Sequence, residues 1–154
     1  MKVMVGGTFD PLHDGHRSLL VRSFQLAGKN GQVDIGLTTD LFASRKVHPT
    51  RTFDARRTEL VKFISDQDFS AHWIVEPLDD RYGSALDADF DAIVVSEETL
   101  PVAVEINKLR RERGKKKVDI HQITCVLAED GHWISSTRIW RGEIDEHGRL
   151  MGKK

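Results

Sequence analysis

Two histidines with the spacing of phosphate donors follow a glycine pair near the start of the chain. Gly6 and Gly7 can turn sharply and let the backbone approach a ligand, because no Cβ is in the way. His13 and His16 project from the next turn, where we expect a helix to begin near Gly15. The first N–H groups of a helix lack internal partners and attract anions. The segment therefore predicts a polyphosphate site with both imidazoles as donors.

The same spacing has other interpretations. A metal centre would need further ligands that only Asp10 or Asp14 can supply, so we predict no metal held by the protein itself. A glycine turn with exposed histidines would have no binding role. Neither a P-loop nor a G-x-G-x-x-G pattern is present, because no Gly-Lys-Ser/Thr follows and the glycine spacing differs.

Three hydroxyl side chains and an arginine gather much later in the chain. Ser135, Ser136 and Thr137 precede Arg138 at the expected start of the last helix. N-capping accounts for one such hydroxyl, hardly for three. A guanidinium near the positive end of a helix is unfavourable unless an anion lies there. We expect a second phosphate site, which shares one cleft with the first.

Two polar segments follow expected strands. Tyr82 and Gly83 can shape an acceptor pocket, although Asp79 or Asp80 can equally well cap a turn there. The segment that begins at Ser96 and Glu97 has the position that meets the base or ribose in nucleotide-binding folds.

The elements that must position these residues alternate between strand and helix. We expect strands at residues 2–5, 32–38, 72–76, 92–95 and 118–127, and helices at 16–27, after Thr52, after Pro101 and after Ser135. The second helix should turn Phe53, Arg57, Leu60, Val61 and Ile64 inward, and residues 41–51 should form a basic loop. This rhythm predicts one α/β domain over residues 1–145, built around a parallel sheet. We expect a Rossmann-like, doubly wound sheet of five strands in the order 3-2-1-4-5. The charged tail after Gly142, including residues 146–154, should fray.

Composition limits the class of protein further. With 23 lysines and arginines against 24 acids the formal net charge is −1, so we expect no nucleic-acid partner. The basic run at 110–117 lacks interleaved aromatics and is typical of a solvated helix end. Cys125 is the single cysteine, and no apolar run approaches the ~20 residues that cross a bilayer. We expect a cytoplasmic protein without a membrane segment.

Together these segments resemble the nucleotidyltransferase superfamily. GTFDP at residues 7–11, followed by HDGH at 13–16, is similar to its H-x-G-H signature, and ISSTRI at 134–139 to its second signature. With LDDRYG, VVSEET and LAEDG, the chain to about Asp145 resembles the archaeal phosphopantetheine adenylyltransferases.

The resemblance implies transfer of AMP from ATP to 4′-phosphopantetheine, which gives dephospho-coenzyme A and pyrophosphate, with Mg²⁺ carried by ATP. It implies catalytic roles for His13, His16, Lys46 and Arg138. It implies ATP contacts by Gly7, Thr8, Phe9, His16, Ser96, Glu97, Ser135, Ser136, Thr137 and Arg138, and acceptor contacts by Thr8, Lys46, Tyr82 and Gly83. Lys46 can also be an ordinary loop cation. The alternatives are a cytidylyltransferase, an FMN or nicotinamide-mononucleotide adenylyltransferase, or a non-catalytic nucleotide-binding module.

Overall fold

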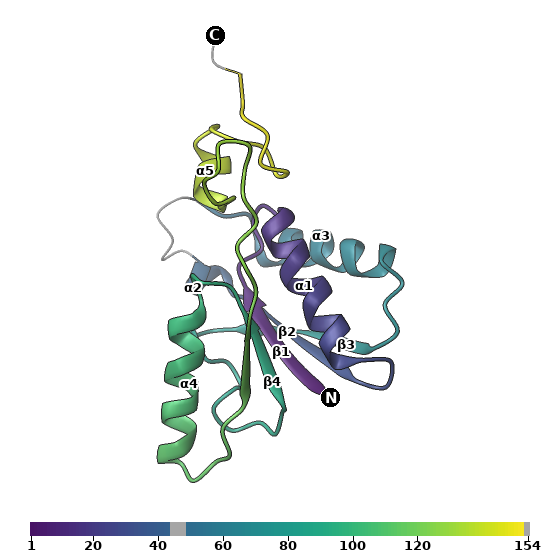
Figure 1. Ribbon diagram of the computed structural model, residues 1–154, viewed down its shortest axis with the longest axis vertical. Helices are drawn as coiled ribbons and strands as arrows, with labels where there is room; N and C mark the ends of the chain where they lie inside the picture. Colours follow the sequence, from purple (N-terminus) through teal and green to yellow (C-terminus); the bar gives the residue numbers. More distant parts are fainter. Residues whose placement is uncertain (44–48, 153–154) are drawn as a thin grey trace.

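A five-stranded parallel sheet forms the centre of the single domain (Figure 1). The structure, a computed structural model, describes residues 1–43 and 49–152. The strands lie in the order β3-β2-β1-β4-β5, so the predicted topology is confirmed. Their bounds are Lys2–Gly7 (β1), Gln32–Thr38 (β2), His72–Leu78 (β3), Ala92–Val95 (β4) and Asp119–Gln122 (β5).

Helices cover both faces of the sheet. They are Asp14–Ala27 (α1), Asp40–Ala43 (α2), Phe53–Asp66 (α3), Leu100–Glu112 (α4) and Ser136–Trp140 (α5). Val3 and Val5 of β1 belong to the core shared with α1 and α3, whereas Met4 between them packs with Ile106 of α4. Alternate residues of a strand point to opposite faces, so this division places α1 and α3 on one face and α4 on the other. No helix within the two described ranges is long and apolar enough to span a membrane.

Several element boundaries differ from the sequence prediction. Gly6 and Gly7 are the last residues of β1, and the chain turns just after them, at Phe9, which has a φ of 51°. β3 continues to Leu78, beyond its predicted end at residue 76. β5 ends at Gln122, before its predicted end at residue 127, because the chain leaves the sheet after Gln122. Residues 41–43 of the expected basic loop belong to a short helix, α2.

The inner face of α3 was predicted correctly at Leu60 and Ile64, which are buried, but not at its arginine. Thr52 caps the helix as expected, by accepting a hydrogen bond from the Ala55 N–H at 3.2 Å. Arg57 is exposed, however, and Arg56 is completely buried. Spacings of three and four residues both fall on one helical face, so the apolar pattern alone admits either arginine.

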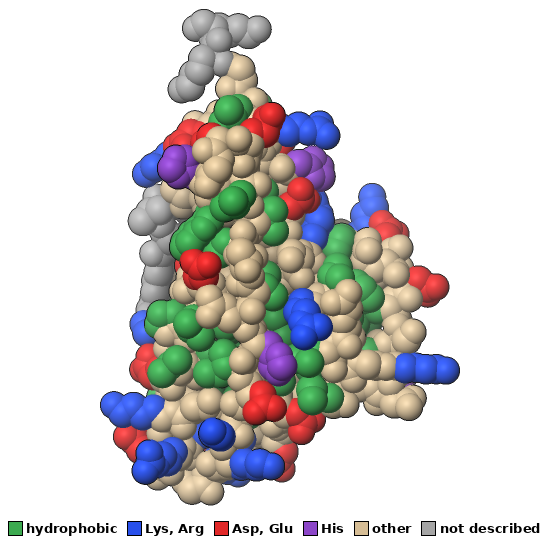
Figure 2. Space-filling view, in the orientation of Figure 1, with side chains coloured by type: hydrophobic (Ala, Val, Ile, Leu, Met, Phe, Trp, Pro, Cys, Tyr) green, Lys and Arg blue, Asp and Glu red, His purple; other side chains and the backbone are tan. Residues whose placement is uncertain are grey.

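The basic run at the end of α4 is solvated, with one exception. Figure 2 shows basic side chains gathered at that end of the molecule with acidic ones among them, and Arg113 pairs with Asp87 at 2.8 Å. Arg110 is only 2% exposed and donates to the carbonyls of Ala85 and Ala88, both at 2.8 Å. This arginine is therefore part of the interior and does not belong to the solvated helix end.

Candidate active site

A short turn carries the chain from β1 to the first helix. His13 is the N-cap of α1, and its Nδ1 accepts hydrogen bonds from the N–H groups of Gly15 at 3.0 Å and His16 at 3.4 Å. In return, His16 Nδ1 accepts from the His13 N–H at 3.3 Å. The two rings stack with centroids 3.7 Å apart. A Cβ at Gly15 would lie 2.8 Å from His13 Cε1, so the glycine leaves room for the capping imidazole.

These hydrogen bonds determine which nitrogen of each imidazole carries the proton. A ring nitrogen that accepts from a backbone N–H presents its lone pair, so a neutral imidazole carries its hydrogen on the other nitrogen. Both His13 and His16 are thus oriented as Nε2–H donors. The predicted histidine pair is brought together as expected, but through reciprocal capping that the spacing did not reveal.

The start of α1 differs from the expected anion site in one respect. The N–H groups of Gly15 and His16 bond to His13, and the N–H of Asp14 bonds to the carbonyl of Glu146 at 3.0 Å. The helix therefore does not present these N–H groups to a ligand, and the expectation of unpaired ones is wrong.

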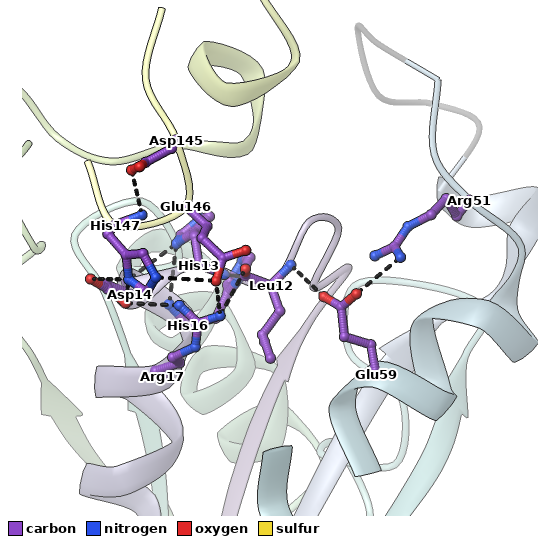
Figure 3. Close-up of polar contacts among 11 residues, drawn as sticks. Leu12, His13, Asp14, His16, Arg17, Arg51, Glu59, Asp145, Glu146 and His147 are labelled. Atoms are coloured by element: carbon purple, nitrogen blue, oxygen red, sulfur yellow. Dashed lines mark hydrogen bonds and ion pairs between the residues drawn. The ribbon is translucent and has the colours of Figure 1, made fainter. Parts of the chain in front are cut away.

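The C-terminal segment holds this turn from one side (Figure 3). Arg17 joins Asp14 at 2.8 Å to Glu146 at 2.7 Å, and His147 Nδ1 lies 3.0 Å from Asp14. Hydrogen bonds from the backbone N–H groups of Arg149 and His147 hold the pKa of Asp145 below its ordinary value. Residues 143–151 are thus folded against the domain, and the expectation of a frayed tail is wrong for them.

Residues of α3 and of the segment before it hold the turn from the other side. The Asp10 carboxylate accepts from both the backbone N–H and Nε of Arg51, each at 2.6 Å. Glu59 accepts from the Leu12 N–H at 3.1 Å and from Arg51 at 3.0 Å (Figure 3). The histidine turn is therefore fixed by groups that come from three distant parts of the chain.

The serine-rich segment begins α5, a helix of only five residues. Ser135 is its N-cap and accepts from the Arg138 N–H at 3.2 Å. The Arg138 guanidinium bonds to Asp130, to Glu143 at 3.1 Å and to the Trp133 carbonyl at 3.0 Å. The hydrogen bond between Arg138 and Asp130 raises the pKa of Arg138 and lowers that of Asp130. The anion that the sequence argument required is thus supplied by two carboxylates of the protein. Ser136 and Thr137 are half-buried beside Ser135.

A cavity of about 240 Å³ lies between the carboxyl ends of the central strands and α4. Most of its wall is apolar, including Ile93, Val102 and Ile106. Of the predicted site residues, Gly7, Thr8 and Tyr82 line it. The histidines, Phe9, Gly83, Ser96, Glu97 and residues 135–138 lie outside its lining. Polar lining residues that sequence reasoning missed include Thr38, Glu76, Arg81 and Ser84.

The segment at 80–83 forms the capped turn that was one of the two interpretations left open by the sequence. The Asp80 carboxylate accepts from the N–H groups of Tyr82 at 2.9 Å and Gly83 at 2.7 Å, so it caps the turn. The Tyr82 hydroxyl donates to Glu105, which raises the pKa of Tyr82, and Arg81 lies 3.7 Å from the same carboxylate. Gly83 has a φ of 54°, in the left-handed region that favours glycine. Capping thus presents Tyr82 to the cavity.

Thr8 has partners that its position in the sequence did not indicate. Its hydroxyl accepts from the Thr38 hydroxyl at 3.0 Å, and Thr38 in turn accepts from Arg56 Nη1 at 3.2 Å. The Thr8 carbonyl also accepts from Arg56 at 3.2 Å. All three residues are buried. Two features of the sequence could have indicated these contacts. Thr38 stands at the end of an expected strand, and an arginine falls on the apolar side of the helix after Thr52.

Two other predicted site residues, Ser96 and Glu97, do not line the cavity. Ser96 closes the turn after β4, where its N–H donates to Thr99 Oγ1 at 3.2 Å, and Glu97 is exposed. Lys46 and Arg45 lie outside the described residues. Among the described residues, no group of three or more His, Cys, Asp or Glu side chains could hold a metal ion.

Known proteins match nearly the whole chain. The cytidylyltransferase-like family model matches residues 4–142. The phosphopantetheine adenylyltransferase of Methanosarcina barkeri is 47% identical over 150 residues, which is 97% of this chain and 92% of that protein. The enzyme of the same name from Archaeoglobus fulgidus is 41% identical over 151 residues, which is 98% of this chain and 100% of that protein.

A solved structure shares the fold. A crystal structure of an Archaeoglobus fulgidus protein of unknown function has a TM-score of 0.71 and 36% identity, and the match covers 80% of this chain and 89% of that one. The chain therefore belongs to the cytidylyltransferase-like family, as a relative of the archaeal phosphopantetheine adenylyltransferases.

Proposed function

We infer that this chain is a phosphopantetheine adenylyltransferase, which transfers AMP from ATP to 4′-phosphopantetheine and releases dephospho-coenzyme A and pyrophosphate. The observation that carries this inference is the match of 41–47% identity with archaeal enzymes of that name over nearly the whole chain. The largely apolar cavity at the carboxyl edge of the sheet supports it. Ligands of open parallel sheets bind at that edge, and a pantetheine arm is a long neutral chain with few polar groups.

We place the acceptor in that cavity, with its phosphate at the end lined by Gly7 and Thr8. Thr8 and Tyr82 line the cavity and were both predicted to contact the acceptor. Gly83 acts indirectly, because it allows the turn that presents Tyr82. The apolar wall formed by Ile93, Val102 and Ile106 suits the uncharged part of the arm.

We place ATP along the turn that carries His13 and His16 and the serine-rich turn at residues 135–137. His13 and His16 supply Nε2–H donors for its phosphates, and this role is supported by the capping bonds that occupy both Nδ1 atoms. Arg138 and the hydroxyls at 135–137 would bind the departing pyrophosphate, with Lys46 as a further cation. Because Arg138 is paired with Asp130 and Glu143, it would have to share its donors with the substrate. Contacts by Gly7, Phe9, Ser96 and Glu97 complete the proposed ATP site.

The reaction needs positioning and charge stabilisation more than proton transfer. A phosphate oxygen of phosphopantetheine forms the new bond to the α-phosphorus as the bond to the β-phosphate oxygen breaks, and pyrophosphate leaves with that electron pair. The nucleophile is already an anion near neutral pH, so no general base is required. Positioned donors stabilise the charge that develops on the phosphates. We expect Mg²⁺ to arrive on ATP and to stay largely hydrated, because this ion gives up its waters reluctantly.

An acceptor screen tests the proposal. Purified protein is incubated with ATP or CTP and, separately, with 4′-phosphopantetheine, FMN or nicotinamide mononucleotide, and pyrophosphate release is measured. We expect release only with ATP and 4′-phosphopantetheine. Release with CTP or another acceptor would identify a different nucleotidyltransferase, and ATP binding without any release would identify a non-catalytic module.

Substitution of His16 tests the histidine donors. His16→Ala should lower kcat by about 10²–10³, the usual effect of losing one charge-stabilising donor. His72→Ala is the matched control, because His72 is exposed at the start of β3, far along the strand from the carboxyl edge. Wild-type turnover by His16→Ala would contradict the assignment.

A further inference from the structure

The buried guanidinium of Arg56 contacts Thr8, the residue that binds the acceptor phosphate in the proposed function. Arg56 is 0% exposed, and its guanidinium reaches from α3 to the carboxyl ends of β1 and β2. Its Nε donates to the Arg51 carbonyl at 2.9 Å, and its Nη2 lies 3.2 Å from Asp40. The remaining bonds go to the Thr8 carbonyl and the Thr38 hydroxyl, each at 3.2 Å. A charged side chain is rarely this deeply buried unless its donors have partners.

The hydrogen bonds of the two threonines have a definite direction. A guanidinium can only donate, so Thr38 Oγ1 is the acceptor in its contact with Arg56. The single hydrogen of Thr38 is directed to Thr8 Oγ1, 3.0 Å away. Thr8 Oγ1 is therefore an acceptor toward the protein, and its own hydrogen is left for a different partner. Both threonines line the cavity, so that partner can be a ligand.

We propose that Thr38 and Arg56 are positioning residues that hold the Thr8 hydroxyl as a hydrogen-bond donor to the acceptor phosphate. The proposal rests on the proposed function, which places that phosphate at Thr8. A phosphate dianion accepts hydrogen bonds and has none to donate, so a hydroxyl turned the other way would present a lone pair to an anion. The chain from guanidinium to hydroxyl to hydroxyl fixes the productive orientation before the substrate arrives.

The charge of Arg56 strengthens this effect. In a buried setting, a cation polarises the hydroxyls bonded to it, and successive hydrogen bonds reinforce one another. The carboxylate that pairs with Arg56, Asp40, has a side chain 62% exposed and lies on the other branch of the guanidinium. Water screens that carboxylate, whereas the branch that faces Thr38 is buried. Lysine could not replace this arrangement, because the planar fork is what reaches several acceptors at once.

A double-mutant cycle tests the positioning role. Thr38→Val removes the hydroxyl at nearly constant shape, and Thr38→Ser, the matched control, keeps it. Each is made in the wild-type and Thr8→Val backgrounds, and kcat/KM for 4′-phosphopantetheine is measured at saturating ATP, with the ATP Kd measured separately. Thr38→Val should lower kcat/KM about ten- to a hundredfold, the range for a hydrogen bond to a charged group. Thr38→Ser should stay within about threefold of wild type, and the ATP Kd within about twofold.

In the Thr8→Val background, Thr38→Val should have almost no further effect, because Thr38 acts through Thr8. The same loss in both backgrounds, an equal loss with Thr38→Ser, or a matching change in ATP Kd would overturn the positioning role. Melting curves establish that each variant folds, and Thr38→Ala takes the place of Thr38→Val in the cycle if the valine variant does not. If the wild-type protein releases no pyrophosphate from ATP and 4′-phosphopantetheine, the proposed function itself is wrong, an outcome distinct from those of the cycle.

Discussion

Ile144 belongs to a small hydrophobic cluster that is separate from the two clusters on the faces of the sheet. It is 1% exposed and packs with Ala128 and Ile134, and the partly buried Val126 and Ile139 lie against them. In Figure 1 this region, with α5, stands beyond the carboxyl edge of the sheet. The serine-rich turn is therefore supported by a core of its own, which Ile144→Ala would disrupt.

The expected cost follows from the burial of that side chain. Replacing Ile144 by alanine removes three buried carbon atoms, and each buried methylene contributes about 0.8 kcal/mol. The cavity left behind adds to this loss, so isoleucine-to-alanine changes in cores cost about 2–5 kcal/mol. Because the cluster is small and its surroundings can partly collapse, we expect about 3 kcal/mol. The loss should act on local opening of this region, since few buried contacts join it to the sheet.

Hydrogen exchange followed by mass spectrometry measures that opening. In Ile144→Ala, amides in residues 126–150 should exchange about a hundredfold faster, the factor that corresponds to about 3 kcal/mol. Amides of β1 and β2 should change less than twofold. Leu150→Ala is the matched control, because Leu150 bridges to Ile144 through the backbone but is 51% exposed, and it should accelerate exchange less than threefold.

Two results would refute this reasoning. Equal acceleration in β1 and in residues 126–150 would mean that the C-terminal cluster and the sheet open as one unit. Unchanged exchange in residues 126–150 would mean that the buried isoleucine contributes little to holding the region closed.

Three further perturbations follow from the contacts. Arg110→Met should lower the free energy of unfolding by about 3 kcal/mol in urea titrations, because buried carbonyls lose their donor; a loss under 1 kcal/mol would contradict this. Gly36→Ala should cost about 1–3 kcal/mol, since the new Cβ would lie 2.7 Å from the Leu78 side chain, and Leu78→Ala in the same protein should relieve the clash. Asp130→Asn should lower Tm at pH 7, and the difference from wild type should vanish as the pH falls through the lowered pKa of Asp130, below 3.8. The sign follows because the bond to Arg138 favours the charged carboxylate, so its stabilisation is present above that pKa and lost below it; a Tm difference that persists at low pH would exclude the ion pair as its cause.

The sheet and the pairing of the two histidines follow from patterns local in the sequence. Alternating apolar strands and helical stripes predicted the five strands and their parallel arrangement, both of which the structure shows. The motif HDGH predicted that two imidazoles lie side by side, and their centroids are 3.7 Å apart. Period and turn chemistry act over a few residues, so a single sequence reveals them.

Partners that come from distant segments were not predictable in the same way. The spacing of apolar residues in α3 admitted either Arg56 or Arg57 on the buried side, and only packing against the strand ends selects Arg56. Arg138 lies near the positive end of a helix, and for that reason we predicted a bound phosphate beside it. In the structure, the carboxylates of Asp130 and Glu143 pair with Arg138 instead.

By itself, the sequence determined the fold class, the strand order expected of its family, and the residue types available for binding phosphate. The tertiary structure decided which donors those residues still offer to a ligand. The Asp14 N–H is bonded to the Glu146 carbonyl, and the Thr8 hydroxyl is bonded to Thr38. The physical reason is that secondary structure depends on neighbours a few residues apart, whereas a hydrogen bond depends on which groups the completed fold brings within about 3 Å.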